Sequence, residues 1–133
     1  MTKFRIYGFE RMDVYKNALR FSSTIRKVVV DFPTHERYEL TSQLKRAADS
    51  IRANLAEGSG RASNIDQAHF TNMAYSSGLE VIDDLNMALL MKYICAETYE
   101  NLRIELDVIL GQLNSLYKFQ INNNNTLKKK IRD

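Results

Sequence analysis

The chain has 133 residues and a formal net charge of +3, and 44% of its residues are apolar and 26% charged. This length and composition are typical of one globular domain, and they exclude a disordered chain or two well-cored domains. No apolar run approaches the roughly 20 residues of a membrane span and no signal peptide opens the chain, so we expect a cytoplasmic protein without a membrane partner.

The first predicted helix runs from about Met12 to Val30 and follows an N-terminal segment (1–10) that we expect to pack on the bundle end in an extended form. Apolar residues recur along the helix at steps of three and four, which keeps one face inward. They are Val14, Ala18, Phe21, Ile25 and Val28. Pro33 stops this helix, because the residue before a proline is pushed out of the helical region.

The second predicted helix runs from about His35 to Ser59, with Thr34 as its N-cap and Glu36 in its first turn. Its apolar line consists of Leu40, Leu44, Ala47, Ala48, Ile51 and Leu55. We expect Gly58 and Gly60 to supply the left-handed residue that commonly ends a helix.

The third predicted helix begins near Ile65 with Ser63 or Asn64 as its cap, and the fourth runs from about Ala96 to Lys118. The third carries a broad apolar arc of Ala74, Tyr75, Gly78, Val81, Ile82, Leu85, Ala88 and Leu89. The fourth carries a regular stripe of Tyr99, Leu102, Leu106, Ile109, Leu113 and Leu116.

Four helices of about 20 residues joined by short connections predict an all-α fold, an up-down-up-down antiparallel four-helix bundle over residues 11–121. The tail (122–133) has no apolar period and carries four basic residues, so we expect it to be disordered.

The most distinctive motif lies in the second helix and its exit. It reads Pro33-x-x-Glu36, then Leu40-Thr41-x-Gln43-x-x-Arg46-Ala47-x-x-Ser50-Ile51-x-x-Asn54-Leu55-x-Glu57-Gly58-x-Gly60-Arg61. It continues with Phe70, Ala74-x-x-Ser77-x-x-Glu80 and Tyr93-Ile94. This text resembles the 23S rRNA intervening sequence protein family, also called four-helix bundle proteins, over roughly residues 9–120.

The resemblance implies a four-helix bundle assembled as a homopentameric ring, in an RNA context without a defined reaction. It also implies kinship with the nucleic-acid-binding accessory protein of diversity-generating retroelements. Tyr75 stands where the family usually has a basic residue, which removes one candidate phosphate contact. Lys92 stands where the family usually has glycine, which weakens the C-cap of the third helix.

A line of polar residues borders the apolar stripe of the second helix at heptad spacing. The polar seam consists of Gln43, Ser50, Asn54, Glu57 and Arg61, together with Glu80 of the third helix. Three interpretations stay open. The seam is a polar interface between subunits that sets register, a ligand- or RNA-reading edge, or an intramolecular network in which Glu57 pairs with Arg61.

The candidate nucleic-acid-binding residues lie in the basic first half of the chain. Residues 1–61 hold 12 Lys/Arg against 7 Asp/Glu, whereas residues 62–121 hold 3 against 8. The candidates are Lys16, Arg20, Lys27, Lys45, Arg46, Arg52 and Arg61. They would contact phosphates in a salt-sensitive manner, and no aromatic platform for stacking bases is evident. The same division also fits head-to-tail attraction between copies, complementary packing of the two halves of the bundle, or solvated surface cations.

Further apolar residues lie off the stripes. They are Ile104, Val108 and Gly111 on the fourth helix, and Met73, Met87 and Met91 around Glu80 and Asp84 on the third. Such lines favour self-association, and the alternative is loose packing under the N-terminal segment or the tail.

No motif for catalysis, a metal, a cofactor or a small-molecule substrate is evident. Asp66-x-x-His69 is one i, i+3 pair, whereas a di-iron bundle site needs two such motifs and two further carboxylates. The single cysteine, Cys95, is expected to be a buried or inert thiol. We therefore expect a non-catalytic oligomeric bundle that binds RNA or ribonucleoprotein, with a homo-oligomeric protein-interaction scaffold as the alternative.

Overall fold

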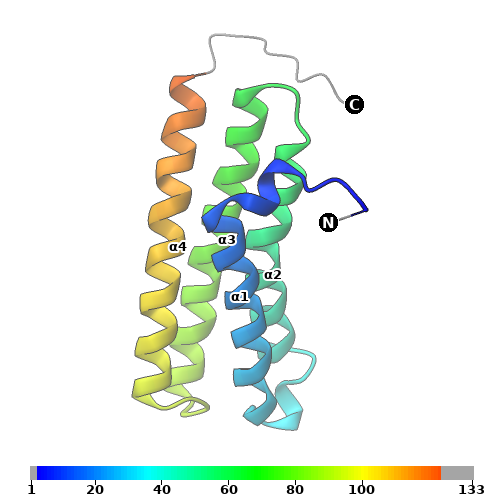
Figure 1. Cartoon of the computed structure of the whole chain (residues 1–133). Coiled ribbons are helices and arrows are strands. Elements are labelled where there is room, and N and C mark those ends of the chain that lie inside the picture. The colour runs from blue at the N-terminus through cyan, green and yellow to red at the C-terminus, as the bar shows by residue number, and fades with distance from the viewer. Residues whose placement is uncertain (1–2, 124–133) are drawn as a thin grey trace.

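The computed structural model describes residues 3–123, in which four α-helices and three short 3-10 turns form the regular structure and no strand occurs. The helices are α1 (Asp13–Val28), α2 (Leu40–Ser59), α3 (Asn64–Leu90) and α4 (Ala96–Asn122). Successive helices run in alternating directions along one elongated bundle (Figure 1). The prediction of an all-α fold with four helices is confirmed. The predicted disordered tail begins inside α4, and its residues 124–133 lie outside the described part of the chain.

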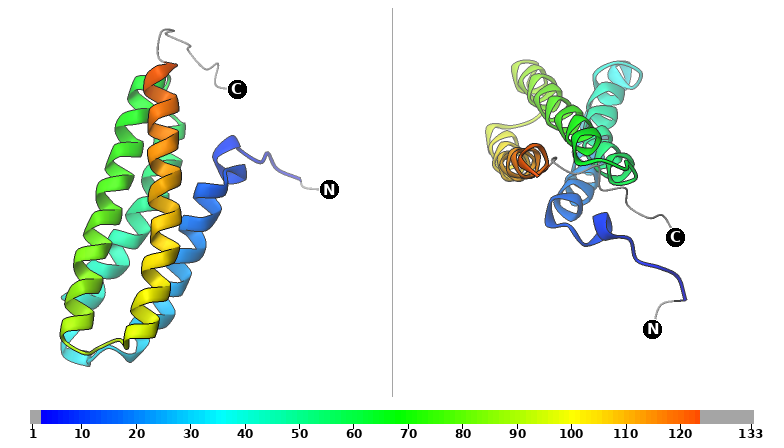
Figure 2. Two further views of the ribbon diagram at one scale, coloured as in Figure 1. Left: turned by 90° about the vertical axis from the view of Figure 1, so that its left-hand side faces the viewer. Right: turned by 90° about the horizontal axis from the view of Figure 1, so that it is seen from above.

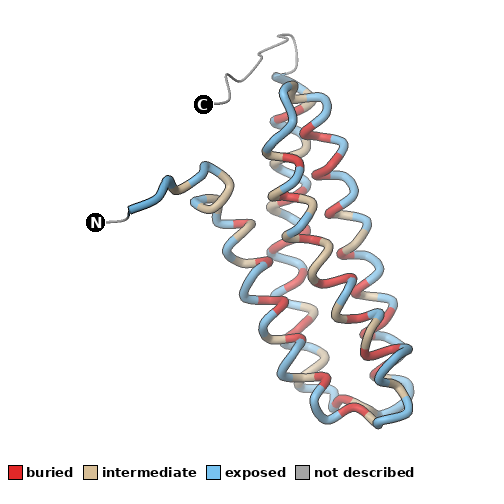
Figure 3. The backbone as a smooth tube through the Cα atoms, turned by 90° about the vertical axis from the view of Figure 1, so that its right-hand side faces the viewer, coloured by how far each residue is buried: buried red, intermediate tan, exposed pale blue. Residues whose placement is uncertain are grey.

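The core follows the predicted apolar stripes, and buried stretches recur along all four helices (Figure 3). Every predicted stripe residue of α2 is buried. The arc of α3 is centred on Ala74, Val81 and Ala88, while Tyr75 and Ile82 are half-buried at its edge. The arc is broad because α3 packs against both α2 and α4.

Helix α2 begins at Leu40, five residues later than predicted, and Thr34 is not its cap. Thr34–Glu36 form a separate 3-10 turn, η3, and Glu39 has a non-helical backbone with φ −119° and ψ −105°. The reason is burial: no residue from Thr34 to Glu39 is buried, and the Tyr38 side chain is 85% exposed. The apolar stripe that holds the helix on the bundle starts only at Leu40.

The two glycines at the end of α2 do not supply the predicted left-handed residue. Gly60 has φ −81°, and no glycine among the described residues has positive φ. Gly58 is instead required by packing, because a Cβ atom built on it would lie 2.6 Å from Cβ of Phe70 on α3. The absent side chain allows α2 and α3 to approach closely.

Caps define the starts of α3 and α4. Ser63 accepts a hydrogen bond from the Asp66 amide at 3.1 Å, which confirms one of the two predicted caps of α3. Cys95 caps α4, since its Sγ accepts from the Thr98 amide at 3.5 Å. The thiol is exposed rather than buried, and its hydrogen bonds with Thr98 lower its pKa. Its exposure follows from its place outside the apolar stripe of α4.

Helix α3 ends at a left-handed residue that is not a glycine. Lys92 has φ 62°, its N–H donates to Leu89 O at 3.0 Å, and the Tyr93 N–H donates to Ala88 O at 2.9 Å. These two hydrogen bonds form a Schellman motif. A lysine in this left-handed conformation is strained by its Cβ atom, whereas a glycine would not be. This strain is the physical reason for the weaker cap that we predicted at Lys92.

The two helix connections at the lower end of the bundle touch each other. Tyr93, after α3, donates a hydrogen bond from its hydroxyl to Glu36 Oε2 at 2.8 Å. Its ring also packs on Phe32, with centroids 5.5 Å apart. Glu36 therefore links the α1–α2 connection to the α3–α4 connection.

The N-terminal segment projects away from the helices before it reaches α1 (Figure 2). It is not wholly extended as predicted, because Gly8–Arg11 form a 3-10 turn, η1. Phe9 of this turn packs edge-on against Tyr15 of α1 at 5.0 Å between ring centroids. This contact holds the turn beside the upper end of the bundle.

Candidate functional site

A basic face runs over the outer sides of α1 and α2. Lys16, Arg20 and Lys27 are exposed and, at 100° per residue, fall within about 40° of one another on α1. Lys45 and Arg52 lie on the side of α2 that faces α1. The α1–α2 basic face is defined by these residues: Lys16, Arg20, Lys27, Lys45 and Arg52.

Asp49 is an acidic residue on the basic face and lies between Lys45 and Arg52 along α2. Arg26 donates to both of its carboxylate oxygens at 2.7 Å, and Arg52 lies 3.4 Å from Oδ1. The Arg26 hydrogen bonds hold the pKa of Asp49 below its usual range. Among residues 3–123, these two arginines and Asp49 make the only ion pairs, so most of the positive charge on the face is not neutralised.

The remaining two predicted basic residues lie elsewhere. Arg46 is exposed on the other edge of α2, toward α3, and Arg61 is exposed in the connection that follows α2. The Arg61 guanidinium stacks over the Phe70 ring at 4.8 Å from its centroid, and its carbonyl accepts from Gln67 Nε2 at 3.0 Å. The seven candidates therefore do not form one surface.

The polar seam is divided in the same way. Asn54 Nδ2 donates to the carbonyl and hydroxyl of Ser50 at 2.9 and 3.0 Å, and Ser77 Oγ on α3 donates to Ser50 Oγ at 2.8 Å. This part is an intramolecular link between α2 and α3. The other four members are exposed: Gln43, Glu57, Arg61 and Glu80. The predicted Glu57–Arg61 ion pair is not formed, because Arg61 stacks on Phe70.

Asp84 is a buried carboxyl on α3 that the site predictions did not include. Its side chain is only 5% exposed, and its Oδ2 atom has no hydrogen-bond partner in the described chain. Burial, and then the nearby carboxylates Glu80 and Asp83, raise its pKa to about 6. Only its spacing in the sequence indicates this position, since Asp84 follows Ser77 by one heptad on the edge of α3 that faces α2.

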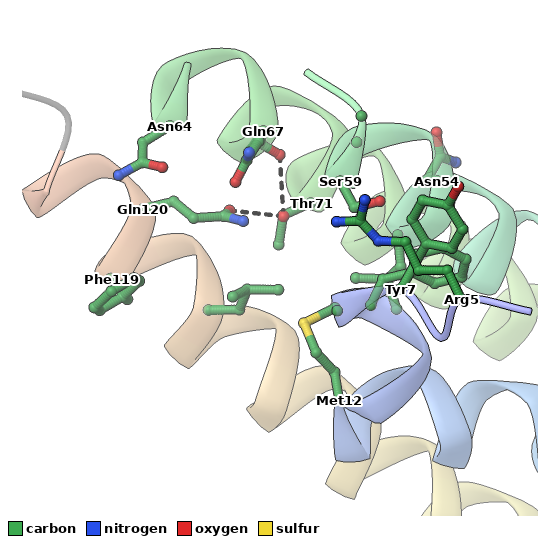
Figure 4. Close-up of a pocket in the computed structure, with 16 residues that line it drawn as sticks. Arg5, Tyr7, Met12, Asn54, Ser59, Asn64, Gln67, Thr71, Phe119 and Gln120 are labelled. Carbon is green, nitrogen blue, oxygen red and sulfur yellow. Dashed lines mark hydrogen bonds between the residues drawn. The ribbon is translucent and has the colours of Figure 1, made fainter. Parts of the chain in front are cut away.

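The end pocket, a hollow of about 540 Å³, lies at the upper end of the bundle between the N-terminal segment, α2, α3 and α4. Arg5 and Tyr7 lie on one side of it and Phe119 and Gln120 on the other (Figure 4). The hydroxyl of buried Thr71 lies 2.7 Å from Gln120 Oε1. No acid, histidine or cysteine among residues 3–123 lines it, so the described part of the end pocket offers amides and aromatic rings for binding but no acid–base pair.

The base pocket, a second hollow of about 370 Å³, lies at the lower end of the groove between α1 and α2. Its lining includes Arg26, Arg37 and Lys45, and no acidic residue of the described chain lines it. Arg26 and Arg37 were not among the predicted basic candidates. In the sequence they differ from other basic residues of the first half in no local pattern. Arg37 reaches the same pocket as Arg26 only because a turn precedes α2, where a continuous helix was predicted.

The described residues contain neither a metal-binding cluster nor a membrane-spanning helix. No group of three or more histidine, cysteine or acidic residues there could hold a metal ion, and Asp66 and His69 are both exposed. No described helix is long and apolar enough to cross a membrane.

Both predicted off-stripe apolar lines reach the surface. Ile104 and Val108 of α4 are 58% and 53% exposed, and nothing lies within 4 Å of a Cβ atom built on Gly111. On α3, Met73, Met87 and Met91 are also exposed. The α4 outer line (Ile104, Val108 and Gly111) therefore faces away from the core.

Together these features define a four-helix bundle with a basic face and two hollows. A model of the 23S rRNA-intervening sequence protein family matches residues 10–115, and the chain belongs to this family. The resemblance carried by the α2 motif is thereby confirmed.

The fold is also similar to a solved structure, a protein of unknown function from the S23 ribosomal protein family of Bacteroides thetaiotaomicron. The TM-score is 0.73 and the identity 24%, over 79% of this chain and 95% of that one. No curated protein matches the chain.

Proposed function

We propose that this protein is a non-catalytic cytoplasmic bundle that binds RNA, free or within a ribonucleoprotein, through the α1–α2 basic face. The observation that carries the proposal is the outward line of Lys16, Arg20 and Lys27 beside a groove in which Asp49 alone forms ion pairs. The family's description, which refers to an intervening sequence of 23S rRNA, supports RNA as the nucleic acid.

The chemistry of this face suits contact with phosphates rather than bases. Lysine and arginine side chains gain affinity by releasing the counterions condensed on the nucleic acid. The face carries no aromatic side chain among its five residues, so base stacking is not expected there. Binding should therefore depend strongly on salt and weakly on sequence.

The proposal predicts a loss of RNA affinity when charge is removed from α1. The double variant Lys16→Gln/Arg20→Gln should bind structured RNA about tenfold more weakly in 50 mM salt, and the slope of log K against log salt should fall by about two. An electrophoretic shift titration at several salt concentrations measures both quantities.

The matched control removes two charges from the acidic half of the chain. Lys92→Gln/Lys118→Gln should keep the affinity and salt slope of the unchanged protein. An equal loss of RNA affinity in both double variants would mean that net charge, and not the α1–α2 basic face, determines binding. Absence of salt-sensitive binding at micromolar protein would rule out the proposed function.

Self-association is a second candidate function, favoured by the α4 outer line. Exposed apolar side chains beside a glycine permit close helix contact between copies. We propose a homo-oligomer, the pentamer that the family resemblance implies, which would serve as a scaffold. Light scattering after size exclusion should give a mass that is a multiple of 15.4 kDa; a monomer at all concentrations contradicts this candidate.

A further inference from the structure

We propose that the base pocket is a binding site for a phosphate group. Three cationic side chains line it, namely Arg26, Arg37 and Lys45, and no carboxylate among the residues that the structure describes does so. Arg37 and Lys45 form no ion pair or side-chain hydrogen bond within residues 3–123. Two cations held without a counterion beside one hollow favour an anionic occupant.

An unsatisfied hydroxyl supports this assignment independently of the charges. Thr41 lines the base pocket and is only 8% exposed, yet its Oγ1 atom has no hydrogen bond in the described chain. The oxygen is not fully enclosed by protein, so the hydroxyl stays accessible and is free to bond to an occupant of the pocket. A phosphate oxygen would accept from this hydroxyl. Thr41 is also in the first turn of α2, whose positive dipole end attracts anions.

The remaining wall explains how the charges are held and what anion they match. The two hydrogen bonds to Asp49 fix the Arg26 guanidinium and neutralise its charge. Arg37 and Lys45 then leave two positive charges, which match the −1.5 to −2 that a phosphate monoester carries near pH 7. The buried side chains of Val29 and Phe32 close the apolar side of the pocket.

Two sources present the phosphate oxygens that this site recognises. One is a small molecule or an RNA end with a phosphate monoester, and the other is the RNA backbone, whose phosphodiesters carry one negative charge each. The site does not depend on the proposed function, because the charges and the hydroxyl are present whether or not the α1–α2 basic face binds RNA. The test therefore has one arm with inorganic phosphate and one with an RNA oligonucleotide.

In the first arm, inorganic phosphate is titrated into the ¹⁵N-labelled full chain at pH 7, with chloride keeping the ionic strength constant. Saturable amide shifts are expected around Thr34, Arg37 and Thr41. Arg37→Gln/Lys45→Gln should weaken the apparent phosphate affinity by at least about tenfold. The charge-matched Lys16→Gln/Arg20→Gln should change it less than about twofold. Non-saturable shifts, or equal losses in the two double variants, would overturn the site.

In the second arm, the oligonucleotide is added to phosphate-saturated protein. Competition at the pocket resonances supports the site and assigns RNA as the source of the phosphate. Saturable phosphate binding without any RNA binding supports the site and contradicts the proposed function. RNA binding without saturable phosphate binding contradicts the site and supports the proposed function.

Discussion

Replacing Asp84 with asparagine should raise the free energy of unfolding at pH 7.5 by about 2 kcal/mol. The carboxyl is buried without a partner for Oδ2, and its pKa in the folded protein is raised to about 6. Above that pH the folded state must hold a poorly solvated negative charge. Each pKa unit between the folded and unfolded states corresponds to about 1.4 kcal/mol, which we reduce for residual solvation. Asparagine has nearly the same shape and carries no charge.

The pH dependence gives the sharper test of Asp84. In the unfolded chain the carboxyl releases its proton near pH 4, whereas in the folded protein it keeps the proton to about pH 6. The folded state binds more protons in this window, so its stability falls as the pH rises from about 4 through 6. Urea unfolding of the unchanged protein should show this fall relative to Asp84→Asn.

The control for this experiment is the exposed neighbour Asp83. Asp83→Asn removes the same charge one residue away and should change stability by only a few tenths of a kcal/mol. Parallel stability curves for Asp84→Asn and the unchanged protein between pH 4 and 7 would show that Asp84 titrates normally.

Replacing Gly58 with alanine should destabilise the protein by about 2 kcal/mol. The new methyl group would lie 2.6 Å from Cβ of Phe70, an atom fixed to the α3 backbone, so relief requires α2 and α3 to separate. Overpacking of this kind costs about 1–3 kcal/mol and exceeds the gain from the better helix propensity of alanine. Urea unfolding with the change in midpoint at constant m value measures the effect.

Gly111→Ala is the matched control, since the same substitution on α4 meets nothing within 4 Å. It should stabilise the fold by about 1 kcal/mol through helix propensity. If both Gly58→Ala and Gly111→Ala lost stability, the loss at Gly58 could not be assigned to the α2–α3 contact.

The sequence was sufficient for those parts of the fold that depend on local periodicity. The α2 stripe, the Ser63 cap and the start of α4 were predicted because each follows from neighbours within one or two turns. The start of α2 was not, because propensity and the position after Pro33 favoured an earlier helix. Burial of an apolar stripe, which begins only at Leu40, decides that residues 34–39 do not form the first turns of α2.

The candidate sites were less predictable because they depend on contacts across helices. The Arg26–Asp49 pair joins residues 23 positions apart, and no local pattern indicates it. Ser50 and Asn54 were placed on the correct edge of α2, but their partner Ser77 settles that they bond within the chain. The side chain of Asp84 was grouped with exposed neighbours, since a helical wheel cannot show how closely α2 covers it.

The contact between Tyr93 and Glu36 means that the two ends of the bundle are held together in different ways. At the lower end both helix connections are joined through this hydrogen bond and the Phe32 ring. At the upper end α1 begins only at Asp13, while α4 continues to Asn122 beside the projecting N-terminal segment. Both helix-to-helix connections of the lower end are thus joined to each other. At the upper end α3 and α4 are held together by side-chain hydrogen bonds instead, from Thr71 to Gln120 and from Asn64 to the Asn123 carbonyl.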